Sequence, residues 1–202
     1  MTMSSTSGVE AAAREALAGA LIVLPTDTVY GIAARPDSQD AMERLFEAKG
    51  RSHEVAVAVL AATPLEARDV ASHDERATRL ARRAWPGPVT LVLPRTPRSA
   101  EWSLGGDPAT IGVRVPNHPV AMDLLSRTGP LAVSSANRSG DETPATCEAL
   151  RAVFADRVAA YLCDAGELRS RPSAVLDLTR DEPVVLRDGA LERADIERLL
   201  SD

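Results

Sequence analysis

Short apolar runs alternate with capped amphipathic segments along the chain, and this alternation limits the fold more than any other feature. Residues 21–24 and 55–60 are apolar at every position, as expected for strands that are covered on both faces. Residues 37–48 have helical spacing, with Asp37 or Ser38 as the cap and Gly50 where a helix ends. Interleaved strands and helices predict an α/β fold with a mixed sheet.

The same patterns predict the other elements. Thr63, Pro64 and Glu66 form a helix start, in which threonine is the cap, proline the first helical residue and glutamate the capping-box partner. Further helices are expected at 9–18, 74–84, 118–126, 146–154 and 193–200, and further strands at 89–93, 111–115, 131–134, 160–162, 174–178 and 184–186. Because no linker-like break separates them, residues 9–202 are predicted to form one domain, preceded by a disordered N-terminus at 1–8.

Composition and charge exclude several classes of protein. With 45% apolar residues among 202, the chain is able to bury a sizeable core. A net charge of -6 argues against general nucleic-acid coating but leaves a local basic groove open. Cys147 and Cys163 are too few for a disulfide framework, which favours a reducing compartment. The apolar stretch at 16–24 is too short for a membrane span and lacks signal-peptide features, so a cytoplasmic location without membrane partners is predicted.

Lys49 is the single lysine beside 22 arginines. Two interpretations are open: a coding bias toward arginine, or a site where only a compact ammonium on a flexible stem fits. The proximity of Arg51 favours the second interpretation.

Several familiar catalytic devices are excluded by reading the chain. The lysine follows Ala48, so no Walker A loop exists, and no Gly-x-Gly-x-x-Gly or Gly-x-Ser-x-Gly pattern is present. The three histidines, His53, His73 and His118, occur in unrelated contexts, so no metal site is expected.

Four polar segments adjoin the predicted strands: Pro-Thr-Asp-Thr-Val-Tyr-Gly at 25–31, Lys-Gly-Arg at 49–51, Thr-Ile-Gly-Val-Arg-Val-Pro at 110–116 and Ser-Ser-Ala-Asn-Arg-Ser-Gly at 134–140. Singly, turn preferences explain them, and Arg114 could snorkel from an edge strand. Together, cations beside hydroxyls and backbone N–H groups predict a site for a small anionic substrate. We expect it at the carboxyl ends of the strands, where ligands collect in open α/β sheets.

These segments resemble those of the YrdC family, the threonylcarbamoyl-AMP synthases of the TsaC type. The resemblance also includes Trp-Pro-Gly-Pro-Val-Thr at 85–90, Pro-Ser-Ala-Val-Leu-Asp at 172–177 and Leu-Arg-Asp-Gly-Ala at 186–190. It implies a single-domain α/β fold, a twisted open mixed sheet flanked by helices, with a concave, positively charged groove. It also implies a nucleotidyltransferase that condenses L-threonine, bicarbonate and ATP to threonylcarbamoyl-AMP and pyrophosphate. That product serves tRNA threonylcarbamoyladenosine modification, so tRNA and a downstream threonylcarbamoyl transferase complex are the implied partners.

The resemblance further implies roles for individual residues. Lys49 and Arg51 are the implied catalytic residues, which neutralise the triphosphate and the departing pyrophosphate. The resemblance implies that Thr28 and Arg114 bind threonine, with Tyr30 as a wall of its site. The implied ATP-binding residues are Lys49, Arg51, Thr90, Ser135, Asn137, Ser173 and Arg187. Mg²⁺ is expected to arrive on the phosphates of ATP, because the sequence shows no dedicated metal cage.

The chain departs from the family pattern at Ser52, at Ala56 and Val57, at Ser134, and at Ala174 and Leu176. Losing a hydroxyl at Ala174 would remove one ligand contact, worth ~1 kcal/mol. An alternative function is therefore a non-catalytic YrdC-like paralogue that binds nucleotide or RNA. Both functions require distant segments to converge on one cationic pocket, with Lys49 beside the loop of Ser135 and Asn137.

Overall fold

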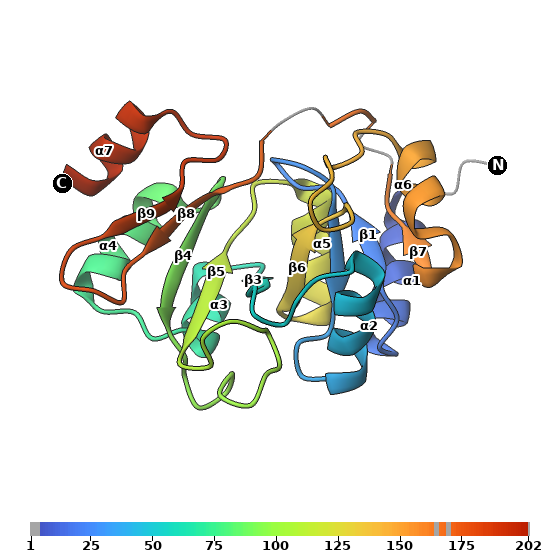
Figure 1. Ribbon diagram of the computed structural model, residues 1–202, viewed down its shortest axis with the longest axis horizontal. Coiled ribbons are helices and arrows are strands. Elements are labelled where there is room, and N and C mark those ends of the chain that lie inside the picture. The colour runs from blue at the N-terminus through green and yellow to red at the C-terminus, as the bar shows by residue number, and fades with distance from the viewer. Residues whose placement is uncertain (1–4, 164–165, 169–170, 202) are drawn as a thin grey trace.

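The computed structural model describes residues 5–163, 166–168 and 171–201, which fold around one nine-stranded sheet (Figure 1). The strands are β1 (Ile22–Leu24), β2 (Gly31–Ala34), β3 (Ala58–Leu60), β4 (Val89–Pro94), β5 (Thr110–Arg114), β6 (Leu131–Ser135), β7 (Ala160–Tyr161), β8 (Ala174–Asp177) and β9 (Val184–Arg187). Their order across the sheet is β7-β1-β2-β6-β3-β5-β4-β8-β9. The pairs β1–β7, β3–β5 and β4–β8 are parallel and the others antiparallel. The predicted α/β class with an open mixed sheet is confirmed.

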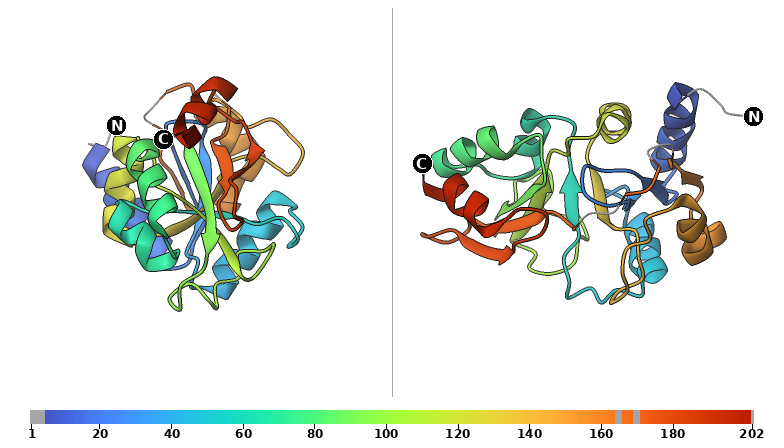
Figure 2. Two further views of the ribbon diagram at one scale, coloured as in Figure 1. Left: turned by 90° about the vertical axis from the view of Figure 1, so that its left-hand side faces the viewer. Right: turned by 90° about the horizontal axis from the view of Figure 1, so that it is seen from above.

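Helices lie on both sides of this sheet. They are α1 (Ser5–Leu17), α2 (Gln39–Lys49), α3 (Pro64–Val70), α4 (Glu75–Ala84), α5 (Pro119–Thr128), α6 (Cys147–Phe154) and α7 (Arg193–Ser201), with a 3-10 turn at Ala155–Arg157. Helices α1 and α5 lie on the side opposite α2, and α1 and α7 lie at opposite ends of the long axis (Figures 1 and 2). No helix among the described residues is long and apolar enough to cross a bilayer.

The predicted helix caps are present. Ser38 accepts a hydrogen bond from the N–H of Ala41, and Gly50 ends the same helix with a left-handed φ of 57°. Thr63 accepts from the N–H of Glu66, whose carboxylate in turn accepts from the N–H of Ala62. Caps are predictable because they satisfy the free N–H groups of the first helical turn with side chains that lie close in sequence.

Two predicted boundaries are wrong, and one strand was missed. Helix α1 begins at Ser5 rather than at residue 9, so residues 5–8 are helical; residues 1–4 lie outside the described residues. Strand β3 spans only the second half of 55–60, because Arg51 donates to the carbonyls of Val55 and Ala56, and the N–H of Val57 donates to Leu104. Strand β2 was not predicted, although it pairs with both β1 and β6.

The two cysteines also differ from expectation. Cys147, at the start of α6, and Cys163, after β7, form a disulfide. The cysteine content therefore no longer supports a reducing compartment, because disulfides persist mainly under oxidising conditions.

Candidate active site

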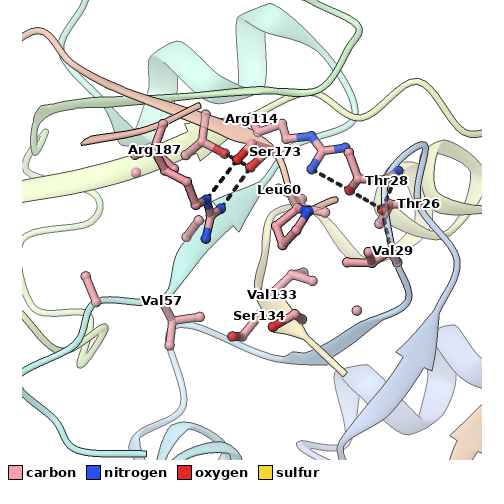
Figure 3. A pocket seen from close by; sticks show the side chains of 18 of the residues that line it. Thr26, Thr28, Val29, Val57, Leu60, Arg114, Val133, Ser134, Ser173 and Arg187 are labelled. Atoms are coloured by element: carbon pink, nitrogen blue, oxygen red, sulfur yellow. Dashed lines mark hydrogen bonds between the residues drawn. The ribbon is translucent and has the colours of Figure 1, made fainter. Parts of the chain in front are cut away.

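A cavity of about 280 Å³ opens over the middle of the sheet (Figure 3). Its floor consists of alternating residues from three neighbouring strands, namely Ala58, Leu60, Thr90, Val92, Gly112 and Arg114. The floor is hollow because its central residues are small: a Cβ on Gly112 would lie 3.3 Å from Thr90 Cγ2 and 3.5 Å from Ala58 Cβ. The prediction that the site lies at the carboxyl ends of the strands is wrong, because the cavity spreads across one face of a sheet whose strands run in both directions.

Most of the predicted site residues line this cavity. They are Thr28, Tyr30, Arg51, Thr90, Arg114, Ser135, Ser173 and Arg187. They come from segments that are far apart in the sequence, so the predicted convergence is present. Two predicted residues, Lys49 and Asn137, are absent from the lining.

Lys49 lies behind the cavity wall, with 1% of its surface exposed. Its ammonium donates to the carbonyl oxygens of Ser135 at 2.5 Å and Asn137 at 2.7 Å, and its own carbonyl accepts from the N–H of Ser139 at 2.8 Å. Burial, followed by the positive charge of Arg51, lowers the pKa of Lys49 to about 8. Lys49 therefore fastens the loop that follows β6 to the end of α2.

Asn137 uses its side chain within that same loop. Its amide donates to the carbonyls of Arg138 and Asp141, and its carbonyl oxygen accepts from the hydroxyl of Thr143. The structure thus shows Asn137 shaping the loop, and its contact with a nucleotide stays a prediction.

Three arginines face the cavity, and no aspartate or glutamate is among the described residues that line it. Burial lowers the pKa of Arg51, and the positive charge of Arg187 lowers it further. Burial also lowers the pKa of Arg114; Asp27 opposes this shift, and Arg187 adds to it. Guanidinium groups that repel one another in this way favour an anion between them.

Arg114 is held by contacts on all three of its nitrogen atoms. Nη2 donates to Asp27 Oδ1 at 2.5 Å, Nη1 to Thr28 Oγ1 at 3.2 Å, and Nε to the carbonyl of Gly87 at 3.0 Å. Strand β5 lies between β3 and β4, and Arg114 is only 5% exposed, so the explanation that it snorkels from an edge strand is wrong. Asp27, which fixes its orientation, was not predicted as a site residue because one sequence does not show which distant residues meet.

The opposite wall carries hydroxyl groups around Arg187. The hydroxyls of Thr90 and Ser173 are 2.8 Å apart. Arg187 donates from Nε to the carbonyl of Ser173 at 2.9 Å and from Nη2 to its hydroxyl at 3.4 Å (Figure 3). These groups offer donors and acceptors for a polar, anionic ligand.

Tyr30 and two residues that the sequence analysis did not assign complete the polar lining. Tyr30 is fully buried, and its hydroxyl donates to the carbonyl of Gly166 at 2.6 Å. Ser134 accepts from Arg51 Nη1 at 3.4 Å, and Thr26 bonds to Thr28. Both belong to polar segments that the sequence had singled out. Among the described residues, no group of three or more His, Cys, Asp or Glu side chains is placed to hold a metal ion.

Comparison with known proteins gives the family. Residues 15–189 match the model of the Sua5/YciO/YrdC family, which bears the description "telomere recombination". A protein of Mycobacterium tuberculosis is 41% identical over 196 residues, which cover 96% of this chain and 89% of that protein. A threonylcarbamoyl-AMP synthase of Pseudomonas aeruginosa is 34% identical over 184 residues, which cover 90% of this chain and 98% of its own.

Solved structures agree with this assignment. The structure of Pyrococcus abyssi Sua5 complexed with L-threonine superposes with a TM-score of 0.87 at 34% identity, covering 99% of this chain and 59% of the Sua5 chain. Escherichia coli YciO superposes with a TM-score of 0.86 at 27% identity, covering 98% of this chain and 95% of its own. With a family match over most of its length and with similar folds, this chain belongs to the Sua5/YciO/YrdC family.

Proposed function

We propose that this protein is an enzyme, a threonylcarbamoyl-AMP synthase that condenses L-threonine, bicarbonate and ATP. The observation that carries the proposal is the convergence of Arg51, Arg114 and Arg187 on one cavity, which has no carboxylate among the described residues of its lining. The relatives add support, since the Pseudomonas aeruginosa protein bears this enzyme name and Pyrococcus abyssi Sua5 was solved with L-threonine.

Threonine would bind at the Arg114 end of the cavity. Each terminal nitrogen of Arg114 carries two N–H groups and uses one of them, on Asp27 and on Thr28. The two remaining N–H groups would donate to the carboxylate of threonine. Thr28 and the ring of Tyr30 would enclose the rest of the amino acid.

The phosphates of ATP would bind at the Arg51 and Arg187 end. Ser135, Thr90 and Ser173 supply polar groups for the nucleotide on the neighbouring walls. The cavity volume lies just below the range of ~300–1,000 Å³ that is common for ligand sites. We therefore assign threonine and the phosphates to the cavity itself, and the adenosine to its open side.

Lys49 would contribute mainly by holding the loop of Ser135 and Asn137 in place. An ammonium has three N–H groups, and Lys49 uses two of them on these carbonyls. The third N–H group would donate to a phosphate of ATP or to a nucleotide bound at Asn137. Mg²⁺ would enter as part of the substrate on the phosphates, whose charge it would partly neutralise.

The reaction would proceed mainly by positioning and charge stabilisation. The threonine amine forms a C–N bond with the carbon of bicarbonate, and water leaves. A carbamate oxygen then attacks the α-phosphorus of ATP, and the bond to pyrophosphate breaks. Arg51 and Arg187 would stabilise the charge that develops on the departing pyrophosphate. The adenylate would pass to a downstream threonylcarbamoyl transferase complex acting on tRNA, and the cytoplasmic location stays a prediction.

Pyrophosphate release by the purified protein tests this proposal. Release should require L-threonine, bicarbonate and Mg-ATP together, and Lys49→Ala should abolish it while the exposed Arg14→Ala, on α1, retains it. Release that is indifferent to threonine would contradict the proposal. Tight tRNA binding with a steep salt dependence and no pyrophosphate release would instead identify a non-catalytic, RNA-binding paralogue.

A further inference from the structure

The hydroxyl of Thr26 is saturated with hydrogen bonds inside the protein. It donates to the carbonyl of Val29 at 2.7 Å and accepts from the backbone N–H of Thr28 at 3.2 Å. It also lies 2.9 Å from the hydroxyl of Thr28. Thr26 is 4% exposed and Thr28 3% exposed, so water does not replace these partners readily.

The positions of the hydroxyl protons follow from this arrangement. A threonine hydroxyl has one proton and two lone pairs. The proton of Thr26 is used on Val29, because a carbonyl is only an acceptor. The proton between the two hydroxyls must therefore come from Thr28, which donates it to Thr26.

The other side of Thr28 is equally constrained. Arg114 Nη1 is only a donor, and it donates to Thr28 Oγ1 at 3.2 Å. Hydrogen bonds thus run in one direction, from Arg114 through Thr28 and Thr26 to Val29 (Figure 3). Thr28 retains one free lone pair and no free proton, and it lines the cavity.

We propose that Thr26 is a positioning residue that makes the hydroxyl of Thr28 an obligate acceptor for an N–H of the substrate amine. This inference rests on the proposed function, which places the threonine carboxylate on Arg114. In an α-amino acid the amine is attached to the carbon next to the carboxylate, so it comes close to Thr28, which touches Arg114. An N–H donated to Thr28 orients the amine and leaves its lone pair for the bicarbonate carbon. Thr26 itself has no hydrogen-bonding capacity left for a ligand.

A matched pair of ligands tests the direction of these bonds. L-2-aminobutyrate and 2-oxobutyrate share one carbon skeleton, but the first presents N–H donors and the second a carbonyl acceptor. Binding of each is measured by calorimetry to the wild type, Thr26→Val and Thr26→Ser. Valine matches the shape of threonine and removes the hydroxyl, which frees the Thr28 proton to point into the cavity.

Thr26→Val should lower the affinity for L-2-aminobutyrate by about three- to tenfold, which is the effect of losing one hydrogen bond. In the same variant the affinity for 2-oxobutyrate should be unchanged or higher. The KM for L-threonine should rise by the same factor as the L-2-aminobutyrate effect, with the KM for ATP unchanged. Thr26→Ser keeps the hydroxyl and should stay within about twofold of wild type.

Equal weakening of both ligands by Thr26→Val would overturn the proposal, because it would show that Thr26 only supports the packing of the loop. No change for either ligand would overturn it as well. If Thr26→Val does not unfold cooperatively, Thr26→Cys takes its place, since a thiol is a weak donor and acceptor and should shift both affinities in the same directions by smaller factors.

The two proposals fail separately. A wild type that releases pyrophosphate, combined with an unaltered ligand preference in the variants, overturns the role of Thr26 and keeps the enzyme function. A wild type that binds L-2-aminobutyrate with the expected variant pattern but releases no pyrophosphate supports the role of Thr26 and overturns the enzyme function.

Discussion

Replacing Lys49 by methionine should destabilise the protein even when no ligand is bound. Methionine is similar in length, but it has no N–H groups for the carbonyls of Ser135 and Asn137. The carbonyl of Ser135 keeps a partner, because the N–H of Asn137 also donates to it at 2.9 Å. The variant therefore loses two charge-assisted hydrogen bonds and leaves the carbonyl of Asn137 without its ammonium donor.

The magnitude follows from two opposing effects. Hydrogen bonds to a charged group contribute ~1.5–3 kcal/mol each, so the two lost bonds correspond to ~3–6 kcal/mol. The variant no longer buries an ammonium, whose desolvation costs several kcal/mol, and this offsets part of the loss. We expect the free energy of unfolding to fall by about 2–3 kcal/mol. For a chain of this length, that corresponds to a Tm lower by roughly 4–12 °C.

Urea unfolding followed by fluorescence of Trp85 and Trp102 measures this change. The urea midpoint should fall by about 1 M with an unchanged slope. Arg14→Met, on the exposed face of α1, is the matched control and should stay within ~0.5 kcal/mol of wild type. If Lys49→Met is as stable as wild type, the hydrogen bonds of Lys49 to the loop after β6 contribute nothing to the stability of the fold. Lys49 would then have to act only on the substrate.

Three further predictions concern pH, the cavity floor and the disulfide. The pKa of Lys49 is about 8 in the folded protein against an ordinary value of 10.5, so the unfolded chain binds more protons between these pH values. The wild type should therefore gain stability relative to Lys49→Met as the pH rises from 8 to 10. Urea midpoints of the two proteins that change in parallel with pH would refute this. Gly112→Val should fill the cavity floor beside Thr90 and raise the KM for L-threonine and the KM for ATP at least tenfold, while the far-ultraviolet circular dichroism stays unchanged. Normal KM values would place these substrates elsewhere. Reducing the Cys147–Cys163 disulfide, which spans a sequence separation of 16, should lower the free energy of unfolding by about 3 kcal/mol. Equal Tm values with and without reductant would show that the disulfide does not stabilise the fold.

Features that depend on neighbours in sequence were predictable. The caps at Ser38 and Thr63 and the left-handed Gly50 form within one helical turn of the residues that specify them. The α/β class followed in the same way from the alternation of apolar runs and capped helices. Strand β2 was missed because its four residues, Gly31–Ala34, begin with the last residue of a polar segment and are too few to show a period.

Features that depend on distant contacts were not predictable from one chain. The first half of 55–60 has the sequence of a buried strand, but the carbonyls of Val55 and Ala56 accept hydrogen bonds from the guanidinium of Arg51 instead of from a neighbouring strand. The bond between Cys147 and Cys163 depends on how α6 and the segment after β7 approach each other. The same holds for the pairing of Asp27 with Arg114, which no local pattern encodes.

The sequence predicted which residues line the site better than it predicted where the site lies on the sheet. The family resemblance named eight residues that line one cavity, including Thr28, Arg51 and Arg187. The sequence did not show that the cavity spreads over the face of the sheet, or that Lys49 lies behind its wall. Both depend on the register of β3, β5 and β6, which is set by the packing of the whole sheet.

Formation of the labelled adenylate is the decisive measurement for the proposed activity. The wild type is incubated with L-threonine, Mg-ATP and ¹³C-labelled bicarbonate, and the products are identified by mass spectrometry. The product should be a threonylcarbamoyl-AMP that carries one ¹³C atom and appears in step with pyrophosphate. Pyrophosphate that accumulates equally without threonine, or an active preparation that yields no labelled adenylate, would contradict it.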